Sequence, residues 1–305
     1  MSNKNIYFMG ILANTDSSIL KINLDRGFSI KSISENEGVD IVSTFESLPY
    51  SKTGNKLFIE FPCLNSSARE LYFISNSFES IDESGFERWN AVAEFENKFL
   101  HSYLDPTIRL MRLFKEGNIC MPLRYYYFID DDGIPKSFTG SETTLHISPN
   151  PKYTLEDSEV SDLDKFIRDT KLPFTESFLQ LAFENFELSY QTHDMNLSFL
   201  SLMISLEILF HPSGQGELNY RISRNAAVLL GKDKKDSKEI KRKVKELYSK
   251  RSAIVHNGKS NGMDNEDLLK LRHYVRESIK EFNKIGKSKD EVLDLVDSIG
   301  FGEMP

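Results

Sequence analysis

Two side chains near the end of a basic stretch are of the types that bind anions and transfer protons. Arg251 and His256 lie five residues apart, directly before Asn257 and Gly258. An arginine is always charged, and its planar guanidinium can hold two anionic oxygens at once. A histidine at the C-terminus of a helix is favoured in its protonated form, because that end of the helix dipole is negative. The pair therefore indicates an anion-binding group beside a proton donor.

A helix over residues 237–257 is predicted to carry both side chains. Its apolar residues recur at helical spacing along one stripe. The stripe consists of Ile240, Val244, Leu247, Ile254 and Val255. Arg251 falls in a gap of this stripe, so its guanidinium is expected to point at a partner helix or another subunit. On an ideal helix His256 lies about 140° away from Arg251, and the imidazole could swing back if the last turn unwinds.

A carboxylate occupies a comparable position in a predicted helix over residues 195–211. Three serines share one narrow face of this helix: Ser198, Ser201 and Ser205. Glu207 lies on the opposite, apolar face. An unpaired charge buried there is costly, so this carboxylate must be paired, protonated or directed into a cleft. One interpretation is purely structural: Arg251 and Glu207 form an ion pair between two helices, and His256 is a surface residue.

The elements that position these residues fall into two regions, with a boundary at Ser148–Pro151. Residues 1–150 are predicted to form an α+β region, in which polar turns separate short β-type runs. The runs are Ile6–Leu12, Ile19–Leu24, Phe28–Ile33, Leu57–Phe61, Leu71–Ile74, Leu123–Ile129 and Ser137–Leu145. The last two flank Asp130–Gly133, which is typical of a hairpin turn; three adjacent aspartates could also bind a metal, but no second ligand cluster accompanies them.

Two helices are expected among these strands, and only helices after them. The first spans Phe86–Phe99; the second has Asp105 as its N-cap and Pro106 at its first position, and ends at Gly117. Residues 151–305 are predicted to be an all-α helical bundle. Its amphipathic segments are 160–170, 175–190, 195–211, 217–230, 237–257, 264–285 and 288–298, with Gly231 and Gly258 where left-handed C-cap residues are needed.

Composition excludes several classes of protein. The chain has 305 residues, of which 39% are hydrophobic and 28% charged, which is typical of a globular protein and not of a disordered or collagen-like one. No apolar run reaches the roughly 18 residues needed to cross a bilayer, and Ile6–Ala13 after Lys4 is a poor match to a signal peptide. Cys63 and Cys120 make neither a disulfide framework nor a zinc pattern. We expect a cytoplasmic protein without a metal or other cofactor.

Charge is distributed unevenly along the chain. The net charge is −8, yet Lys232–Arg251 contains ten basic and four acidic residues, a local charge of +6. An acidic protein is no general nucleic-acid binder, but a concentrated basic segment can follow a phosphate backbone. The alternative is a solvated helix face.

Three stretches in the second region resemble the HEPN superfamily, and most closely its ApeA-type branch of bacterial anti-phage defence. They are Ser205–Phe210, Arg221–Gly231 and Leu247–Gly258, and they match in order and spacing within about residues 175–285. The resemblance implies a helical bundle that dimerises and brings two Arg-x4-6-His motifs into one cleft. Many such proteins are metal-independent endoribonucleases. Arg251 and His256 then match the motif, and Glu207 matches a supporting acidic position.

The implied chemistry is RNA cleavage to a 2′,3′-cyclic phosphate. Two histidines, one from each subunit, would share the proton transfers, Arg251 would bind the phosphate, and Glu207 would orient Arg251. RNA-binding residues are expected to be Lys250, Asn257, Tyr248 and Arg224. For Arg224 a salt bridge within the bundle, and for Tyr248 packing in the dimer contact, are the alternatives.

Three functions are consistent with the sequence. The first is a defence ribonuclease that forms a homodimer through the HEPN domain, with a phage-derived trigger acting at residues 1–150. The second is a catalytically inactive HEPN module that dimerises and binds nucleic acid or a partner protein. The third is a structural helical protein with a buried Arg–Glu pair. The intact Arg-x4-His element favours the first.

Overall fold

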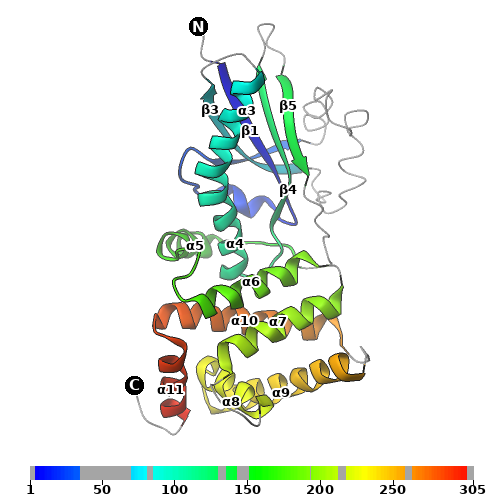
Figure 1. Ribbon diagram of the computed structural model, residues 1–305, viewed down its shortest axis with the longest axis vertical. Helices are drawn as coiled ribbons and strands as arrows, with labels where there is room; N and C mark the ends of the chain where they lie inside the picture. The colour runs from blue at the N-terminus through cyan, green and yellow to red at the C-terminus, as the bar shows by residue number, and fades with distance from the viewer. Residues whose placement is uncertain are drawn as a thin grey trace. The chain divides into compact units, whose positions relative to one another are not determined.

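The computed structural model describes residues 4–34, 70–80, 85–129, 135–142, 151–192, 194–211, 218–257 and 263–300. It divides the chain into two compact units, Met1–Thr170 and Lys171–Pro305 (Figure 1). The boundary therefore lies at Thr170 and not at Ser148–Pro151, where we expected it.

The reason for the later boundary is that α5 (Asp157–Asp169) packs on α4 (Asp105–Phe114) of the first unit. The ring centroids of Phe114 and Phe166 lie 5.6 Å apart, and Lys115 Nζ lies 2.5 Å from Glu159 Oε2. The apolar contacts of α5 therefore decide to which unit it belongs.

The first unit contains a five-stranded antiparallel sheet. Its strands are β1 (Lys4–Ala13), β2 (Ser29–Ser34), β3 (Glu70–Ser80), β4 (Cys120–Ile129) and β5 (Pro135–Glu142), and their order is β2-β3-β1-β4-β5. The apolar run after Lys4 is thus the central strand. Five of the predicted strands are confirmed, and the antiparallel pairing of β4 with β5 agrees with the predicted hairpin. Leu57–Phe61 and Asp130–Gly133 lie outside the described residues.

One predicted strand is wrong. Ile19–Leu24 begins inside a 3-10 helix, η1 (Ser17–Lys21), instead. Asp16 caps it, because its carboxylate accepts a hydrogen bond from the Ser18 backbone N–H at 3.0 Å. Ile19 and Ile22 are both buried; Ile22 is the C-cap, and its backbone N–H bonds to the Ile19 carbonyl, the three-residue spacing of such a helix.

The two predicted helices of this unit form one continuous helical run. It consists of α3 (Gly85–Phe95), a π-helical segment η3 (Glu96–Leu104) and α4. Asp105 is therefore not an N-cap: Leu104 before it is already helical, and its own backbone N–H bonds to the Leu100 carbonyl. This wider turn comes directly before Pro106, which has no N–H to donate. The run crosses one face of the sheet (Figure 1), where the ring centroids of Phe95 and Phe8 lie 5.6 Å apart.

Every secondary-structure element described in the second unit is a helix, in agreement with the prediction. Its described helices are α6 (Ser177–Gln191), α7 (Met195–Phe210), α8 (Leu218–Leu230), α9 (Lys234–Asn257), α10 (Asn265–Ile285) and α11 (Lys289–Gly300). α6, α7 and α10 pack against one another, and α9 packs against α8, α7 and α10 (Figure 1). Within the described chain, no helix has both the length and the apolar character that a bilayer crossing requires.

Small residues allow α6 and α7 to approach closely. The serine face of α7 is buried, and Ser205 Oγ donates a hydrogen bond to the Ala182 carbonyl of α6 at 2.8 Å. This places Glu207 away from α6, as the helical pattern predicted. Gly231 is not the left-handed cap that we expected: a Cβ at this position would lie 2.7 Å from the Ala227 carbonyl oxygen, so close packing is what requires glycine. Gly258 lies outside the described residues.

Candidate functional site

An ion pair between α7 and α9 lies at the centre of the candidate site. Arg251 Nε lies 3.4 Å from Glu207 Oε1, and the two side chains are 25% and 21% exposed. α7 and α9 pack against each other, and Leu206 on α7 and Leu247 on α9 are both fully buried. The pairing predicted from the off-pattern positions of both charges is therefore confirmed. The pair is only partly shielded, so solvent and ligands can reach it.

Tyr248 adjoins this pair. Its ring centroid lies 5.8 Å from Arg251 Cζ. Burial, the negative charge of Glu207 and a hydrogen bond to the Glu207 carboxylate raise the pKa of the Tyr248 hydroxyl, although the charge of Arg251 acts in the opposite direction. The Tyr248 hydroxyl is therefore neutral, and the negative charge of Glu207 acts on it. We call Glu207, Tyr248 and Arg251 the Glu207 cluster.

The guanidinium of Arg251 lies beside Glu207, and its N–H groups remain available to bind a ligand. No hydrogen bond joins it to any residue that the structure describes, and the Glu207 Oε1 atom that faces it also has no hydrogen-bond partner among them. The pair is thus an electrostatic contact at 3.4 Å and not the bidentate fork that arginine forms with carboxylates. An incoming anion with two oxygens can still bind this guanidinium.

His256 is exposed on the last turn of α9. The unwinding that would bring its imidazole back toward Arg251 does not occur, because α9 remains helical through Asn257. Five helical steps therefore leave His256 about 140° around the helix from Arg251. Arg251 points inward to α7, and His256 is on the solvent side. One chain alone does not bring the two groups of the motif together.

Lys250, a predicted RNA-binding residue, is engaged in an ion-pair network. Its Nζ lies 2.5 Å from Asp267 Oδ2 on α10, and Lys243 Nζ lies 2.8 Å from the other oxygen of the same carboxylate. The hydrogen bond to Asp267 raises the pKa of Lys250. Although burial opposes it, the two lysines hold the pKa of Asp267 below its ordinary value of 3.8. Lys250 thus fastens α9 to α10, and binding RNA through it would require breaking this contact.

Arg224 and Asn257 complete the predicted set. Arg224 Nη1 lies 2.8 Å from Asp297 Oδ1, so it joins α8 to α11, in line with the alternative of a salt bridge within the bundle. It packs so closely on Gly300 that a Cβ there would lie 2.4 Å from Arg224 Nη2. The side chain of Asn257 lies outside the described residues. The structure therefore brings together Glu207, Tyr248 and Arg251, and holds Lys250 and Arg224 in other contacts.

Exposed apolar side chains border the Glu207 cluster. Ile204, three residues before Glu207, is 43% exposed, and Val255, four residues after Arg251, is 49% exposed. We expected Val255 in the buried stripe of α9, but it lies outside the intramolecular core. Exposed apolar residues also recur at seven-residue spacing on α6 and α7. We call this set the α6–α7 apolar face: Leu181, Leu188, Leu197 and Ile204.

Sequence reasoning did not identify Asp267 or the α6–α7 apolar face. Asp267 lies in the first turn of α10, where an acidic residue is ordinary because it complements the helix dipole, and its backbone N–H bonds to the Asp264 cap. Leu181 and Leu188 continue an apolar helical pattern, and only their exposure in the structure shows that α6 buries its opposite side.

Comparisons with known proteins give no match: no protein-family model, no curated protein and no solved structure matches this chain. Within the described residues, no three His, Cys, Asp or Glu side chains come together in a way that could hold a metal ion. The interpretation of the site therefore rests on its own residues.

Proposed function

We propose that this chain is a metal-independent endoribonuclease of HEPN type that acts in anti-phage defence in the cytoplasm. The observation that carries the proposal is the Glu207–Arg251 pair, which holds a guanidinium in a partly exposed position with its hydrogen-bonding groups available. A phosphodiester presents two non-bridging oxygens, and the planar guanidinium matches them.

A second copy of the chain is needed to complete the site. Because α9 is helical through Asn257, the imidazole of His256 and the guanidinium of Arg251 point to different sides of one chain. In a dimer, each copy can present its imidazole to the partner's guanidinium. Monomeric proteins rarely expose large contiguous apolar surfaces, so the α6–α7 apolar face beside the Glu207 cluster supports such a homodimer.

The reaction would proceed by proton transfer between two imidazoles. One His256 accepts the proton of the RNA 2′-hydroxyl, whose oxygen forms a bond to phosphorus. The other His256, protonated, donates to the 5′-oxygen as the bond between that oxygen and phosphorus breaks. Arg251 binds the phosphate oxygens as negative charge accumulates on them, and Glu207 and Tyr248 fix its orientation. The products are a 2′,3′-cyclic phosphate and a 5′-hydroxyl end.

The test is to sequence RNA ends after expression of wild type and His256→Ala side by side. Wild type is expected to generate new 2′,3′-cyclic phosphate ends and to protect cells against phage. His256→Ala is expected to do neither. Because His256 is exposed, the variant should keep the circular dichroism spectrum of wild type. Equal cleavage and protection by the two proteins would disprove the assignment.

A catalytically inactive module that dimerises and binds nucleic acid is the second candidate. It is favoured by the outward position of His256 and by the engagement of Lys250 and Arg224 in contacts within the bundle. A gel assay that separates RNA retention from RNA cleavage distinguishes the two functions: retention of intact RNA by wild type supports the binding module, and shortened RNA supports the ribonuclease.

We propose that the first unit, Met1–Thr170, responds to a phage-derived trigger. Deleting this unit tests the idea on Lys171–Pro305, provided that the fragment is first shown to fold by circular dichroism. A trigger acting there would make the fragment either constitutively active or unresponsive to infection. Unchanged dependence of cleavage on infection would contradict it.

A further inference from the structure

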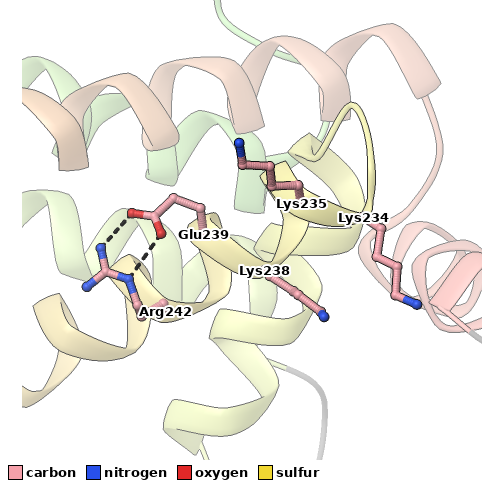
Figure 2. Close-up of a pocket in the computed structure, with 5 residues that line it drawn as sticks. All are labelled: Lys234, Lys235, Lys238, Glu239 and Arg242. Carbon is pink, nitrogen blue, oxygen red and sulfur yellow. Dashed lines mark hydrogen bonds and ion pairs between the residues drawn. The ribbon is translucent and has the colours of Figure 1, made fainter.

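The start of α9 forms one wall of an open basin. The basin has a volume of about 670 Å³ and is lined by Lys234, Lys235, Lys238, Glu239 and Arg242. Figure 2 shows Glu239 and Arg242 bound to each other, with Lys234 and Lys238 projecting on the other side of the helix from Glu239. Two hydrogen bonds, at 2.6 and 3.1 Å, make up the Glu239–Arg242 contact. Since these two charges neutralise each other, the three lysines leave the basin positive.

The basic surface continues from the basin along α9. With about 100° of rotation per residue, Lys234, Lys238, Lys245 and His256 all fall within an arc of about 40°. All four side chains are exposed. We call Lys234, Lys238 and Lys245 the α9 lysine strip. The strip therefore begins at the basin and leads to the imidazole that the proposed reaction uses.

The acidic residues of α9 do not neutralise this strip. Asp233 and Asp236 accept hydrogen bonds from backbone N–H groups at the start of the helix. Glu239 is bound by Arg242. Glu246 pairs with Arg242, Lys243 and Lys250 on the inner side and the flank of the helix. No ion pair joins the strip to a carboxylate among the described residues, so the strip is left to bind anions from outside the chain.

The shape of the strip favours an extended ligand over a compact one. From Lys234 to His256 the helix rises about 33 Å, at 1.5 Å per residue. A stacked single strand has one phosphate about every 3.4 Å, so about ten nucleotides span the same length. A small polyphosphate would contact the basin but could not reach Lys245 and His256.

We propose that the α9 lysine strip is the track on which single-stranded RNA lies, with its backbone anchored in the basin and its scissile phosphate delivered to His256. This inference rests on the proposed ribonuclease function, because that function makes RNA the ligand. It adds to that function the path of the substrate and a minimum substrate length.

The test compares the strip with lysines elsewhere in the same unit. The test variant is Lys234→Gln/Lys238→Gln/Lys245→Gln. The matched control, Lys171→Gln/Lys284→Gln/Lys287→Gln, removes the same charge from exposed lysines outside α9. Binding of 2′-O-methyl RNA, which lacks the attacking hydroxyl, is measured by fluorescence anisotropy at several salt concentrations. Cleavage of unmodified RNA is measured separately.

The slope of log affinity against log salt is negative, and for the strip variant it is expected to become shallower by about 2, which is about 0.7 for each lost phosphate contact. The affinity of this variant at low salt is expected to fall by roughly tenfold or more. The control should keep the wild-type slope. Wild type should bind a strand of about 12 nucleotides more tightly than one of about 4, and the strip variant should lose this preference.

Three results would overturn the proposal: equal salt slopes for the two variants, no binding of RNA by wild type, or displacement of the longer RNA by equimolar tripolyphosphate, which would indicate a compact anion site. Strip-dependent binding without any cleavage of unmodified RNA would support the track and disprove the ribonuclease. The two proposals can therefore fail independently.

Discussion

The inner and outer faces of α9 carry cations in opposite circumstances. On the inner face, Arg251 is paired with Glu207, and Lys243 and Lys250 share Asp267. On the outer face, the α9 lysine strip has no carboxylate partner among the described residues, although α9 contains Asp236, Glu239 and Glu246, and Asp233 directly precedes it. Cations of one helix therefore divide into those that hold the bundle together and those that remain available to a ligand.

The inner face of α9 carries two different kinds of ion pair. Asp267 is almost fully buried and accepts hydrogen bonds from two lysines, whereas Glu207 and Arg251 are partly exposed and do not hydrogen-bond to each other. Buried charges that are fully paired contribute to structure, and removing one partner is costly. A partly exposed, loosely held guanidinium contributes less to stability and more to binding.

The largest expected effect is on cleavage by Arg251→Ala. The rate of RNA cleavage should fall on the order of 10²–10³-fold, because a preorganised group that stabilises transition-state charge is lost. The free energy of unfolding should fall by only about 1 kcal/mol, since the pair is partly exposed. Single-turnover kinetics and urea unfolding give the two values. Arg251→Lys is the control: it should restore stability but not rate, because lysine lacks the fork.

A purely structural pair predicts the reverse for Arg251. Strong destabilisation by Arg251→Ala, with no activity to lose in wild type and no effect of His256→Ala, would place this pair in the same class as Asp267 and remove the distinction between the two inner pairs.

The next effect is that of Asp267→Asn on stability. Removing this charge leaves Lys243 and Lys250 close together without their shared partner, and the free energy of unfolding should fall by about 3 kcal/mol. Asp294→Asn, an exposed substitution on α11, is the control and should change little. Equal unfolding midpoints for the two variants would show that the network on the inner face is not structural.

The pH dependence of stability should identify the same network. The pKa of Asp267 is lowered below 3.8 in the folded chain, so its contribution is present above that pH and is lost as the pH falls through the folded pKa. The pKa values of Lys243 and Lys250 are raised above 10.5, so their contribution is present below that pH and is lost above it. The stability difference between wild type and Asp267→Asn should therefore shrink at both extremes. A difference that is constant with pH would contradict the pairing.

Local sequence patterns predict the helices of the second unit well, but they predict only one of the two ion-pair contacts on the inner face of α9. Arg251 and Glu207 each interrupt an apolar stripe, and this anomaly is enough to predict their contact from the sequence. Asp267 interrupts nothing, because an acidic residue in the first turn of a helix is ordinary, so its two lysine partners could not be deduced. The position of His256 relative to a second copy also depends on packing that a single chain does not contain.

In the first unit, the errors arose where a local signal had two explanations. Asp105 followed by Pro106 is typical of a helix start, but here a π-helical turn carries the preceding helix through to the same proline. The apolar run Ile19–Leu24 suggested a strand, but Ile19 lies in a 3-10 helix and Ile22 is the C-cap that directly follows it, and both are buried. The proline-rich segment at Ser148–Pro151 suggested a boundary, but contacts of α5 extend the unit to Thr170.

A smaller effect is expected from Tyr248→Phe, which tests how loosely the Glu207 cluster is held. Loss of the hydroxyl removes a polar group that acts on the Glu207 carboxylate and should lower the free energy of unfolding by at most about 1 kcal/mol. The ring beside Arg251 is retained, so the rate of cleavage should fall by less than with Arg251→Ala. Tyr220→Phe, on the exposed side of α8, is the control. A loss of rate as large as that of Arg251→Ala would mean that the hydroxyl itself acts in the reaction.

The smallest effect is expected for Glu239→Gln, on the outer side of α9. Glu239 and Arg242 are exposed, and exposed pairs contribute little to stability, so the unfolding transition should be unchanged. RNA binding should nevertheless become tighter, because the substitution removes the closer of the two carboxylates that pair with Arg242 and leaves only the 3.5 Å contact with Glu246, at a basin that the strip lysines already make positive. An increase in the steepness of the salt dependence of about 0.7, which is one added phosphate contact on a single strand, would show that the pair with Glu239 keeps Arg242 from binding the RNA backbone. A lower affinity would mean that Glu239 itself contacts the ligand, and the division of α9 into paired inner and available outer cations would no longer hold.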